Sequence, residues 1–379
     1  GVSIVNVGWS DDRVLDAVEK QLQKMIHISS SYFLEHTAKL AQKLAELSPY
    51  GALKKTFFTN SGAESVETAI SVVRRVSKRP YIMALHRSFH GRTFYAMSAL
   101  GQSQWKVGLG PFAPVVFAPE PYCYRCPLGH QRAPDCGYAC VKYMDEVIRC
   151  EVGGSSIAAL LAEPMLANGG MIIPPPDYFK EVKRVLDKYQ LLFIADEVQS
   201  GNGRTGKLWA IEHYGVAPDL MTTSKAIANG LPLGVTMISD SVDSNLKPGE
   251  HYSTLGGNAL SCAAAMVVLD ELTTGLTETA RDNCTFFHRH ELVPDWEDTG
   301  EQGQRLGIRH LPVERAGLYV PGGLGSYAST LIMNVVPALV AGVKELVICT
   351  PPGRAGSVNP SVLAAARHVL PDMVRLGPN

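Results

Sequence analysis

The chain has 379 residues and almost no net charge, because 35 lysines and arginines are balanced by 36 aspartates and glutamates. A protein without a basic excess has no electrostatic footprint for nucleic acid or for an anionic membrane surface. No apolar run approaches the roughly 20 residues that span a bilayer, and no secretory signal is visible. The eight cysteines are scattered over a long chain, which is typical of reduced thiols in a cytoplasmic protein. We therefore expect neither a nucleic-acid partner nor a membrane.

Most of the chain alternates short apolar runs with helical stretches. Residues 1–50 form a helical segment, with apolar residues at helical spacing in 11–28 and 35–47. From about residue 55, the alternation favours an α/β domain with a largely parallel sheet. Two apolar runs, AALLAE and LLFIADE, end in the carboxylates Glu163 and Asp196. A buried parallel strand that delivers a polar side chain at its carboxyl end has this pattern.

Two short motifs fit the binding of a phosphorylated, flat ligand. Asn60-Ser61-Gly62-Ala63-Glu64 follows an apolar run, and small residues at a strand-to-helix turn let backbone N–H groups approach an anion. Phe89-His90-Gly91-Arg92 places an aromatic ring beside a glycine, where the ring could stack on a heterocycle. Each motif alone has a plainer interpretation. The first would then only cap a helix, and the second would supply a core phenylalanine and a structural histidine.

Two further residues suit the chemistry of an amine. Asp196 ends a buried strand, and a buried carboxylate is costly unless it is paired, for which a protonated pyridine nitrogen is a suitable partner. Lys225 lies in Met221-Thr222-Thr223-Ser224-Lys225-Ala226, before a glycine-rich turn, where desolvation would lower its pKa and favour a Schiff base. The alternatives are an Asp196 paired with an arginine such as Arg204, and a solvated surface lysine.

Taken together, these motifs resemble the class III aminotransferases of the type I pyridoxal-phosphate fold. The matching segments follow in order and spacing: FFTNSGAESVETAI, HRSFHGRTFYAMSALG, LLFIADEVQSGNGRTG, PDLMTTSKAIANGLPLG and HYSTLGGNALSCAAA. The resemblance covers residues 3–272. Within the family, the segments are most similar to 4-aminobutyrate-type ω-aminotransferases and related amino-acid racemases. The implied cofactor is pyridoxal 5′-phosphate, bound by a large domain over residues 51–272 with a mostly parallel sheet flanked by helices.

The resemblance also implies a role for each site residue. Lys225 would hold the cofactor as a Schiff base and shuttle the proton, and Asp196 would pair with the pyridine nitrogen. Glu163 would lie near the substrate. The remaining cofactor-binding positions are Phe89 and Val198 on the two ring faces, His90 beside them, Gln199 at the ring hydroxyl, Ser61, Gly62 and Ala63 at the phosphate, and Thr254 at the phosphate of a neighbouring subunit.

The implied activity is transamination. An amino group would move from an ω-amino acid or amine to a 2-oxo acid, and the family's active sites lie at the interface of a homodimer. A second interpretation keeps the cofactor site without turnover.

The end of the chain departs from this family. After a junction at 273–283, residues 284–379 resemble an internal fragment of histidinol dehydrogenase. The matching residues lie around GLYVPGG and MNVVPALVAGVKE. Strand, glycine turn, apolar helix and strand are expected there, as an α/β segment of different origin. That family uses zinc and NAD, so an oxidoreductase of this kind is the alternative function. Tyr319 and Gly322-Gly323 could then contact a dinucleotide, although a structural role suits them better.

Four cysteines cluster in one stretch. Cys123-x2-Cys126 and Cys136-x3-Cys140 have a spacing compatible with tetrahedral zinc, with His130 between the pairs. Free cysteines in an incidental loop give the same pattern. We assign no metal to the chain on this spacing.

Overall fold

The computed structural model describes residues 3–29, 32, 34–130, 133–290, 295–299, 304–320, 328–350, 366 and 370. The chain divides into two compact units, Gly1–Thr274 and Gly275–Asn379, which are described separately. Among the described residues, no helix combines the length and the apolar character needed to cross a membrane.

The first unit is built on a seven-stranded sheet with the strand order β1-β7-β6-β5-β4-β2-β3. Its strands are β1 (Leu53–Thr59), β2 (Tyr81–Leu85), β3 (Val115–Ala118), β4 (Ile157–Ala162), β5 (Leu192–Asp196), β6 (Leu220–Thr223) and β7 (Gly234–Ser239). Neighbours from β3 through β2, β4 and β5 to β6 are parallel. The expected mostly parallel α/β sheet is confirmed. One strand differs, because β7 is antiparallel to both β6 and β1.

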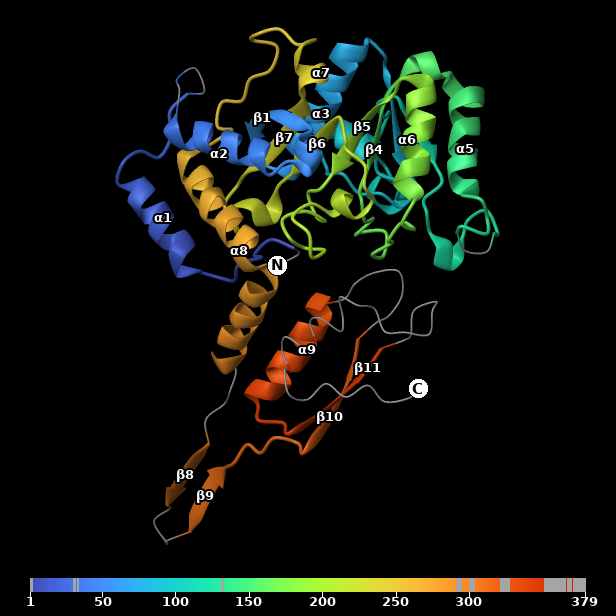
Figure 1. Ribbon diagram of the computed structural model, residues 1–379. Helices are drawn as coiled ribbons and strands as arrows, with labels where there is room; N and C mark the ends of the chain where they lie inside the picture. The colour runs from blue at the N-terminus through green and yellow to red at the C-terminus, as the bar shows by residue number, and fades with distance from the viewer. Residues whose placement is uncertain are drawn as a thin grey trace. The chain divides into compact units, whose positions relative to one another are not determined.

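Helices cover both faces of this sheet (Figure 1). Helix α3 (Gly62–Ser77) packs Val66, Ile70 and Val73 against inward residues of β2, β4, β5, β6 and β7. Successive residues of a strand point to opposite faces. Ile194 of β5 belongs to the α3 face, whereas the neighbouring Phe193 stacks on Phe179 of α6 (Tyr178–Tyr189), so α6 covers the other face. Helix α5 (Ala139–Val147) packs beside α6, and the short α4 (Phe94–Ser98) and α7 (Asp240–Asp243) complete the layers.

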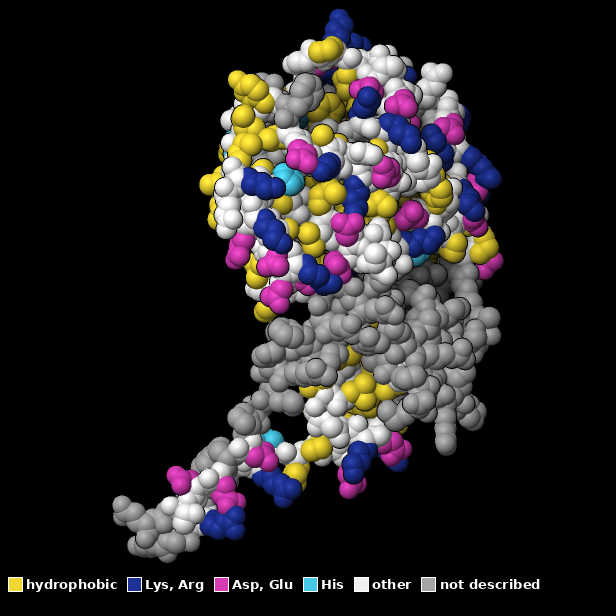
Figure 2. Space-filling view, turned by 60° about the vertical axis from the view of Figure 1, so that its left-hand side comes forward, with side chains coloured by type: hydrophobic (Ala, Val, Ile, Leu, Met, Phe, Trp, Pro, Cys, Tyr) yellow, Lys and Arg dark blue, Asp and Glu magenta, His cyan; other side chains and the backbone are white. Residues whose placement is uncertain are grey.

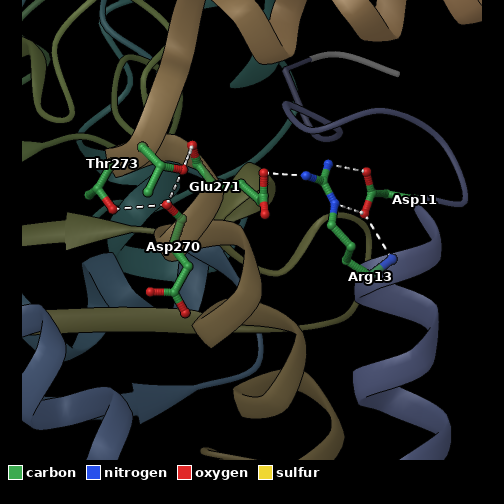
Figure 3. A network of polar contacts seen from close by, with 6 residues as sticks. Asp11, Arg13, Asp270, Glu271 and Thr273 are labelled. Carbon is green, nitrogen blue, oxygen red and sulfur yellow. Dashed lines mark hydrogen bonds and ion pairs between the residues drawn. The ribbon is translucent and has the colours of Figure 1, made fainter.

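The N-terminal helical segment forms ion pairs with the long helix α8 (Ala259–His290). Arg13, at the start of α1 (Asp12–Leu22), contacts Glu271 of α8 and forms a 2.7 Å ion pair with Asp11 (Figure 3). Lys43 of α2 (Glu35–Glu46) contacts Asp270 in the same way. Exposed ion pairs contribute at most about 1 kcal/mol each, so these contacts orient the segment more than they stabilise it.

The second unit contains two small sheets. Strands β8 (Trp296–Thr299) and β9 (Arg305–Ile308) form an antiparallel pair. Strands β10 (Arg315–Tyr319) and β11 (Glu345–Cys349) pair in parallel, with α9 (Ala328–Val340) between them in sequence. A small core of Val320, Leu331, Val335 and their neighbours holds this strand–helix–strand unit. Tyr319 is the last residue of β10, whereas Gly322 and Gly323 lie outside the described residues.

Candidate active site

Asp196 is buried at the carboxyl end of β5, and its carboxylate is surrounded by donors. Oδ2 lies 2.7 Å from Nδ1 of His90, and Oδ1 accepts hydrogen bonds from the backbone N–H of Val198 and the hydroxyl of Thr222, both at 3.1 Å. The partner of Asp196 is therefore His90 rather than Arg204, which was the alternative that the sequence left open. These bonds fix the carboxylate in one orientation at the sheet edge.

Glu163 follows β4, the strand next to β5, and is also buried. Its two carboxylate oxygens accept hydrogen bonds from the backbone N–H groups of Phe89 (2.9 Å) and Ala167 (3.1 Å). Burial nevertheless raises the pKa of this carboxyl to about 7, with His90 opposing the shift and Asp196 adding to it. Glu163 can therefore hold or release a proton near neutral pH.

Lys225 follows β6 and begins a short 3₁₀ helix, Lys225–Ala228. Its Nζ donates a 2.6 Å hydrogen bond to Oε1 of Gln199. Burial lowers the pKa of this amine, Asp196 and Glu163 act against the shift, and Arg204 adds to it. The backbone of Lys225 is left-handed (φ 53°), an uncommon conformation for a residue with a side chain and one that is often found at functional sites.

The turn at Ser61 begins α3 and lies against the same region. The Ser61 hydroxyl accepts a hydrogen bond from the N–H of Glu64, so Ser61 caps the helix. The N–H groups of Gly62 and Ala63 have no carbonyl partner within the helix and are suited to an anion. A larger residue at position 62 would force its neighbours to shift, because a Cβ there would lie 2.7 Å from Cγ1 of Val198. The predicted phosphate turn is thus in contact with the segment that carries Val198 and Gln199.

Two predicted residues lie at the margin of this cluster. Phe89 is half-buried, and its ring meets Trp105 edge-on with the ring centroids 5.7 Å apart. Thr254 is exposed in the segment before α8. The structure thus brings together residues from five separate parts of the sequence around Lys225 and Asp196, and it leaves Thr254 on the surface.

Sequence reasoning missed three polar residues that support the site. Thr222 donates to Asp196 from the adjacent strand, and Asn202 donates to Oγ1 of Thr223 (2.9 Å) and to the carbonyl of Ser224 (3.2 Å). Glu197 is fully buried, and burial raises the pKa of its carboxyl to about 7. Thr222 lies only three residues before Lys225, at the end of a predicted strand, and was predictable from that place, whereas the contacts of Asn202 and Glu197 depend on how their loops fold back.

The four clustered cysteines are free and partly buried. Burial, followed by the neighbouring thiols Cys123 and Cys136, raises the pKa of Cys140 to about 12. In the described part of the chain, no group of three or more His, Cys, Asp and Glu side chains is arranged to hold a metal ion.

The residues present fit pyridoxal phosphate, the cofactor that the motifs imply. The cluster offers a partly desolvated amine at Lys225, a fixed carboxylate at Asp196, and free N–H groups at the N-terminus of α3 beside Val198. An amine, a partner for a pyridinium nitrogen and an anion-binding turn are the three groups that this cofactor requires. His90 Nε2 is buried without a hydrogen-bond partner in the described structure, so the cluster still has an unused polar atom.

Comparison with known proteins gives two family matches. The class-III aminotransferase family model matches residues 1–290, and the histidinol dehydrogenase family model matches residues 242–375. The chain is 39% identical over 272 residues to the leucine/methionine racemase of Thermococcus litoralis, covering 71% of this chain and 61% of that protein. It is 38% identical over 288 residues to a probable 4-aminobutyrate aminotransferase of Bacillus subtilis, covering 74% and 65%. The chain therefore spans less than two thirds of these relatives.

A solved structure agrees with the sequence matches. The chain is similar to an (S)-enantioselective ω-transaminase from Thermomicrobium roseum, with a TM-score of 0.70 and 32% identity, covering 77% of this chain and 67% of that one. The two resemblances noted in the sequence are thus both confirmed, and the sheet is that of the transaminase fold. Since the matching model covers residues 1–290, the chain belongs to the class-III aminotransferase family.

Proposed function

We propose that this chain binds pyridoxal phosphate on Lys225 and transfers an amino group from an ω-amino acid or amine to a 2-oxo acid. The observation that carries the proposal is the position of Lys225. Its amine is partly desolvated, hydrogen-bonded to Gln199 at 2.6 Å, and within the electrostatic influence of Asp196 and Glu163. The large domain over residues 51–272 would supply these residues of the cofactor site, and the same domain of a neighbouring subunit would supply Thr254.

Each residue of the cluster would have its own role in holding the cofactor. Asp196, oriented by His90 and Thr222, would hold the pyridine nitrogen. Phe89 and Val198 would flank the ring, Gln199 would reach its hydroxyl, and the turn at Ser61, Gly62 and Ala63 would hold the phosphate. When bound, pyridoxal phosphate supplies an aldehyde that condenses with amines and a ring that accepts electrons.

Lys225 would then act as the base. A lysine with a lowered pKa is neutral for more of the time at physiological pH, so Nζ can take a proton from the substrate carbon and return it elsewhere. Glu163, whose pKa is raised to about 7, would lie on the substrate side of the site. Its protonation state would set the local charge there. General acid–base work of this kind typically contributes about 10²–10⁴-fold in rate.

We further propose that two copies of the chain form a homodimer. Several large apolar side chains are exposed in two segments, 94–109 and 252–255: Phe94 (64% exposed), Val107 (79%), Tyr252 (60%) and Leu255 (55%). Contiguous exposed apolar patches mark association surfaces, and we propose that these two segments contribute to one. Thr254 lies in the second segment. Dimerisation would therefore explain why a residue that is expected to bind the cofactor phosphate is exposed on the surface. Figure 2 shows a face of the first unit on which acidic, basic and apolar side chains are interspersed.

The test is a half-reaction followed by absorbance. Protein incubated with pyridoxal phosphate should absorb in the visible range, and 4-aminobutyrate should shift this band while one equivalent of oxo product forms. Lys225→Ala should abolish the band, whereas Lys207→Ala, which removes an exposed lysine of the same unit, should retain it. A colourless wild-type protein would refute cofactor binding. A shift without oxo product would favour racemisation, the activity named for the Thermococcus relative.

A further inference from the structure

The backbone of Lys225 has a conformation that its surroundings must hold in place. Its φ of 53° lies in the left-handed region, which is unfavourable for a residue with a side chain unless the neighbouring structure fixes it. Rotation about φ turns the residue relative to the peptide plane before it, and the oxygen of that plane is the Ser224 carbonyl. A group that holds this carbonyl therefore limits how the lysine can turn.

The side chain of Asn202 holds the Ser224 carbonyl. Its Nδ2 donates to this carbonyl at 3.2 Å and to Oγ1 of Thr223 at 2.9 Å, and the residue is only 1% exposed. Because a carbonyl oxygen only accepts, the bond to Ser224 sets which end of the amide carries the donors. Both hydrogens of Nδ2 can then be used at the end of β6, directly before the lysine.

Asn202 is a costly residue at its own position. Its backbone is also left-handed (φ 54°), a conformation that glycine adopts more readily. Its Oδ1 is buried without a hydrogen-bond partner in the described structure, and an unsatisfied buried acceptor is destabilising. A glycine would meet the backbone requirement without the unsatisfied oxygen. What the asparagine adds is therefore the pair of donors to the lysine turn.

The same loop also contacts the amine of Lys225. Nζ donates to Oε1 of Gln199 at 2.6 Å, and Gln199 precedes Asn202 by three residues. The loop is held from a second side, because Nδ2 of Asn6 donates to the Asn202 carbonyl. The segment 199–202 thus fixes the peptide before the lysine and the end of its side chain together.

We propose that Asn202 is a positioning residue for Lys225. By holding the Ser224 carbonyl, it keeps the lysine in its left-handed conformation and keeps the amine beside Gln199. The inference rests on the proposed function, which gives this amine its reaction with the cofactor. The competing explanation is that Asn202 only stabilises its own loop, as any buried and hydrogen-bonded polar residue does.

Two asparagines of the same turn provide a matched pair of variants. Asn202→Gly removes the amide and leaves a backbone that tolerates the left-handed conformation. Asn229 follows the short 3₁₀ helix that Lys225 begins, is also left-handed (φ 47°), and also has an Oδ1 that is buried without a partner in the described structure. Its Nδ2, however, donates to the Gly8 carbonyl at 2.8 Å. Asn229→Gly therefore deletes the same group without removing a contact of the peptide before the lysine.

The first readout is the rate at which the visible band appears when the apo protein is mixed with pyridoxal phosphate in a stopped-flow spectrometer. Asn202→Gly should slow this rate by about 10- to 100-fold, because an amine that is misplaced by about 1 Å loses most of its reactivity. Asn229→Gly should leave the rate within about 3-fold of the wild type, since it removes no contact of the lysine turn. Equal slowing by both variants, or no slowing by Asn202→Gly, overturns the positioning role.

The second readout needs no cofactor. Reductive methylation with isotope-labelled formaldehyde makes each lysine of the apo protein visible by NMR, and the signal lost in Lys225→Arg gives the pKa of Lys225. Asn202→Gly should raise this pKa toward the ordinary value of a lysine, because the freed amine reaches water, whereas Asn229→Gly should not. The charged groups that act on this amine are unchanged in both variants: Asp196, Glu163 and Arg204. The same pKa in Asn202→Gly and the wild type contradicts the inference.

The two readouts distinguish failure of this inference from failure of the proposed function. A wild type that gains no visible band overturns the proposed function, and the pKa of Lys225 in the apo protein then decides the positioning role. A wild type that gains the band, with equal rates and equal pKa values in Asn202→Gly and Asn229→Gly, overturns the positioning role and leaves the proposed function standing. If Asn202→Gly fails to fold by circular dichroism, Asn202→Ala, which lacks the same donors, takes its place.

Discussion

Glu197 provides a quantitative test of the electrostatics around the site. Its carboxylate is fully buried, with Oε1 accepting from the N–H of Ile211 (2.7 Å) and Oε2 from the hydroxyl of Ser200 (2.6 Å). Burial is the largest cause of its shifted pKa, which rises from 4.5 to about 7. Glutamine has the same shape and meets both contacts, since its oxygen accepts from Ile211 and its amide group can donate to the rotatable Ser200 hydroxyl.

The sign and size of the effect follow from proton linkage. Because the pKa of Glu197 is higher in the folded state, its contribution to stability is complete below the unfolded value near 4.5 and is lost as pH rises through about 7. A shift of this size corresponds to about 3 kcal/mol in the free energy of unfolding, at 1.36 kcal/mol for each pH unit. Glu197→Gln removes this loss. The free energy of unfolding of the variant minus that of the wild type should therefore be about 2–3 kcal/mol larger at pH 8 than at pH 5.

Urea unfolding at pH 5 and pH 8, followed by circular dichroism at constant ionic strength, measures this difference. Glu163, whose pKa is raised in the same window, titrates in both proteins and cancels from the comparison. Glu19→Gln, on the exposed face of α1, is the matched control and should show no change between the two pH values. A stability difference between Glu197→Gln and the wild type that is the same at both pH values would refute the assignment of a costly buried charge at Glu197.

Three other substitutions test how the site is held. His90→Phe removes the partner of Asp196 Oδ2 and should weaken pyridoxal-phosphate binding about 10-fold or more by absorbance titration, because a buried charge loses a hydrogen bond; unchanged affinity would contradict this. Gly62→Ala forces a Cβ against Val198, so the midpoint of thermal unfolding should fall by the equivalent of about 1–3 kcal/mol. Asn202→Ala removes two donors from the lysine turn and should cost about 1–2 kcal/mol by urea unfolding, whereas a neutral result would mean that water replaces them.

The sequence was sufficient for the parts of the site that depend on local pattern. Apolar runs that end in Glu163 and Asp196 predicted two strands and the polar residue at the carboxyl end of each, since a buried strand must be apolar until it leaves the core. The turn at Ser61 was predictable as the start of a helix, because serine followed by glutamate three residues later is a capping pattern.

Contacts between distant segments were not predictable in this way. His90 and Asp196 are separated by 106 residues, and nothing local distinguishes His90 from Arg204 as the partner of the carboxylate. The direction of β7 could not be predicted from the sequence either, because an apolar run of this length suits a parallel or an antiparallel strand equally well. The tether between Asn6 and Arg204 depends on how the N-terminal segment folds over the site, which no short pattern encodes.

In the proposed function, Lys225 carries the cofactor. The most direct measurement is borohydride reduction of the protein loaded with pyridoxal phosphate, followed by intact-mass analysis and peptide mapping. We predict one reduced cofactor per chain, located on the peptide that contains Lys225, with no label in Lys225→Ala. A label spread over surface lysines, or none at all, would contradict the account.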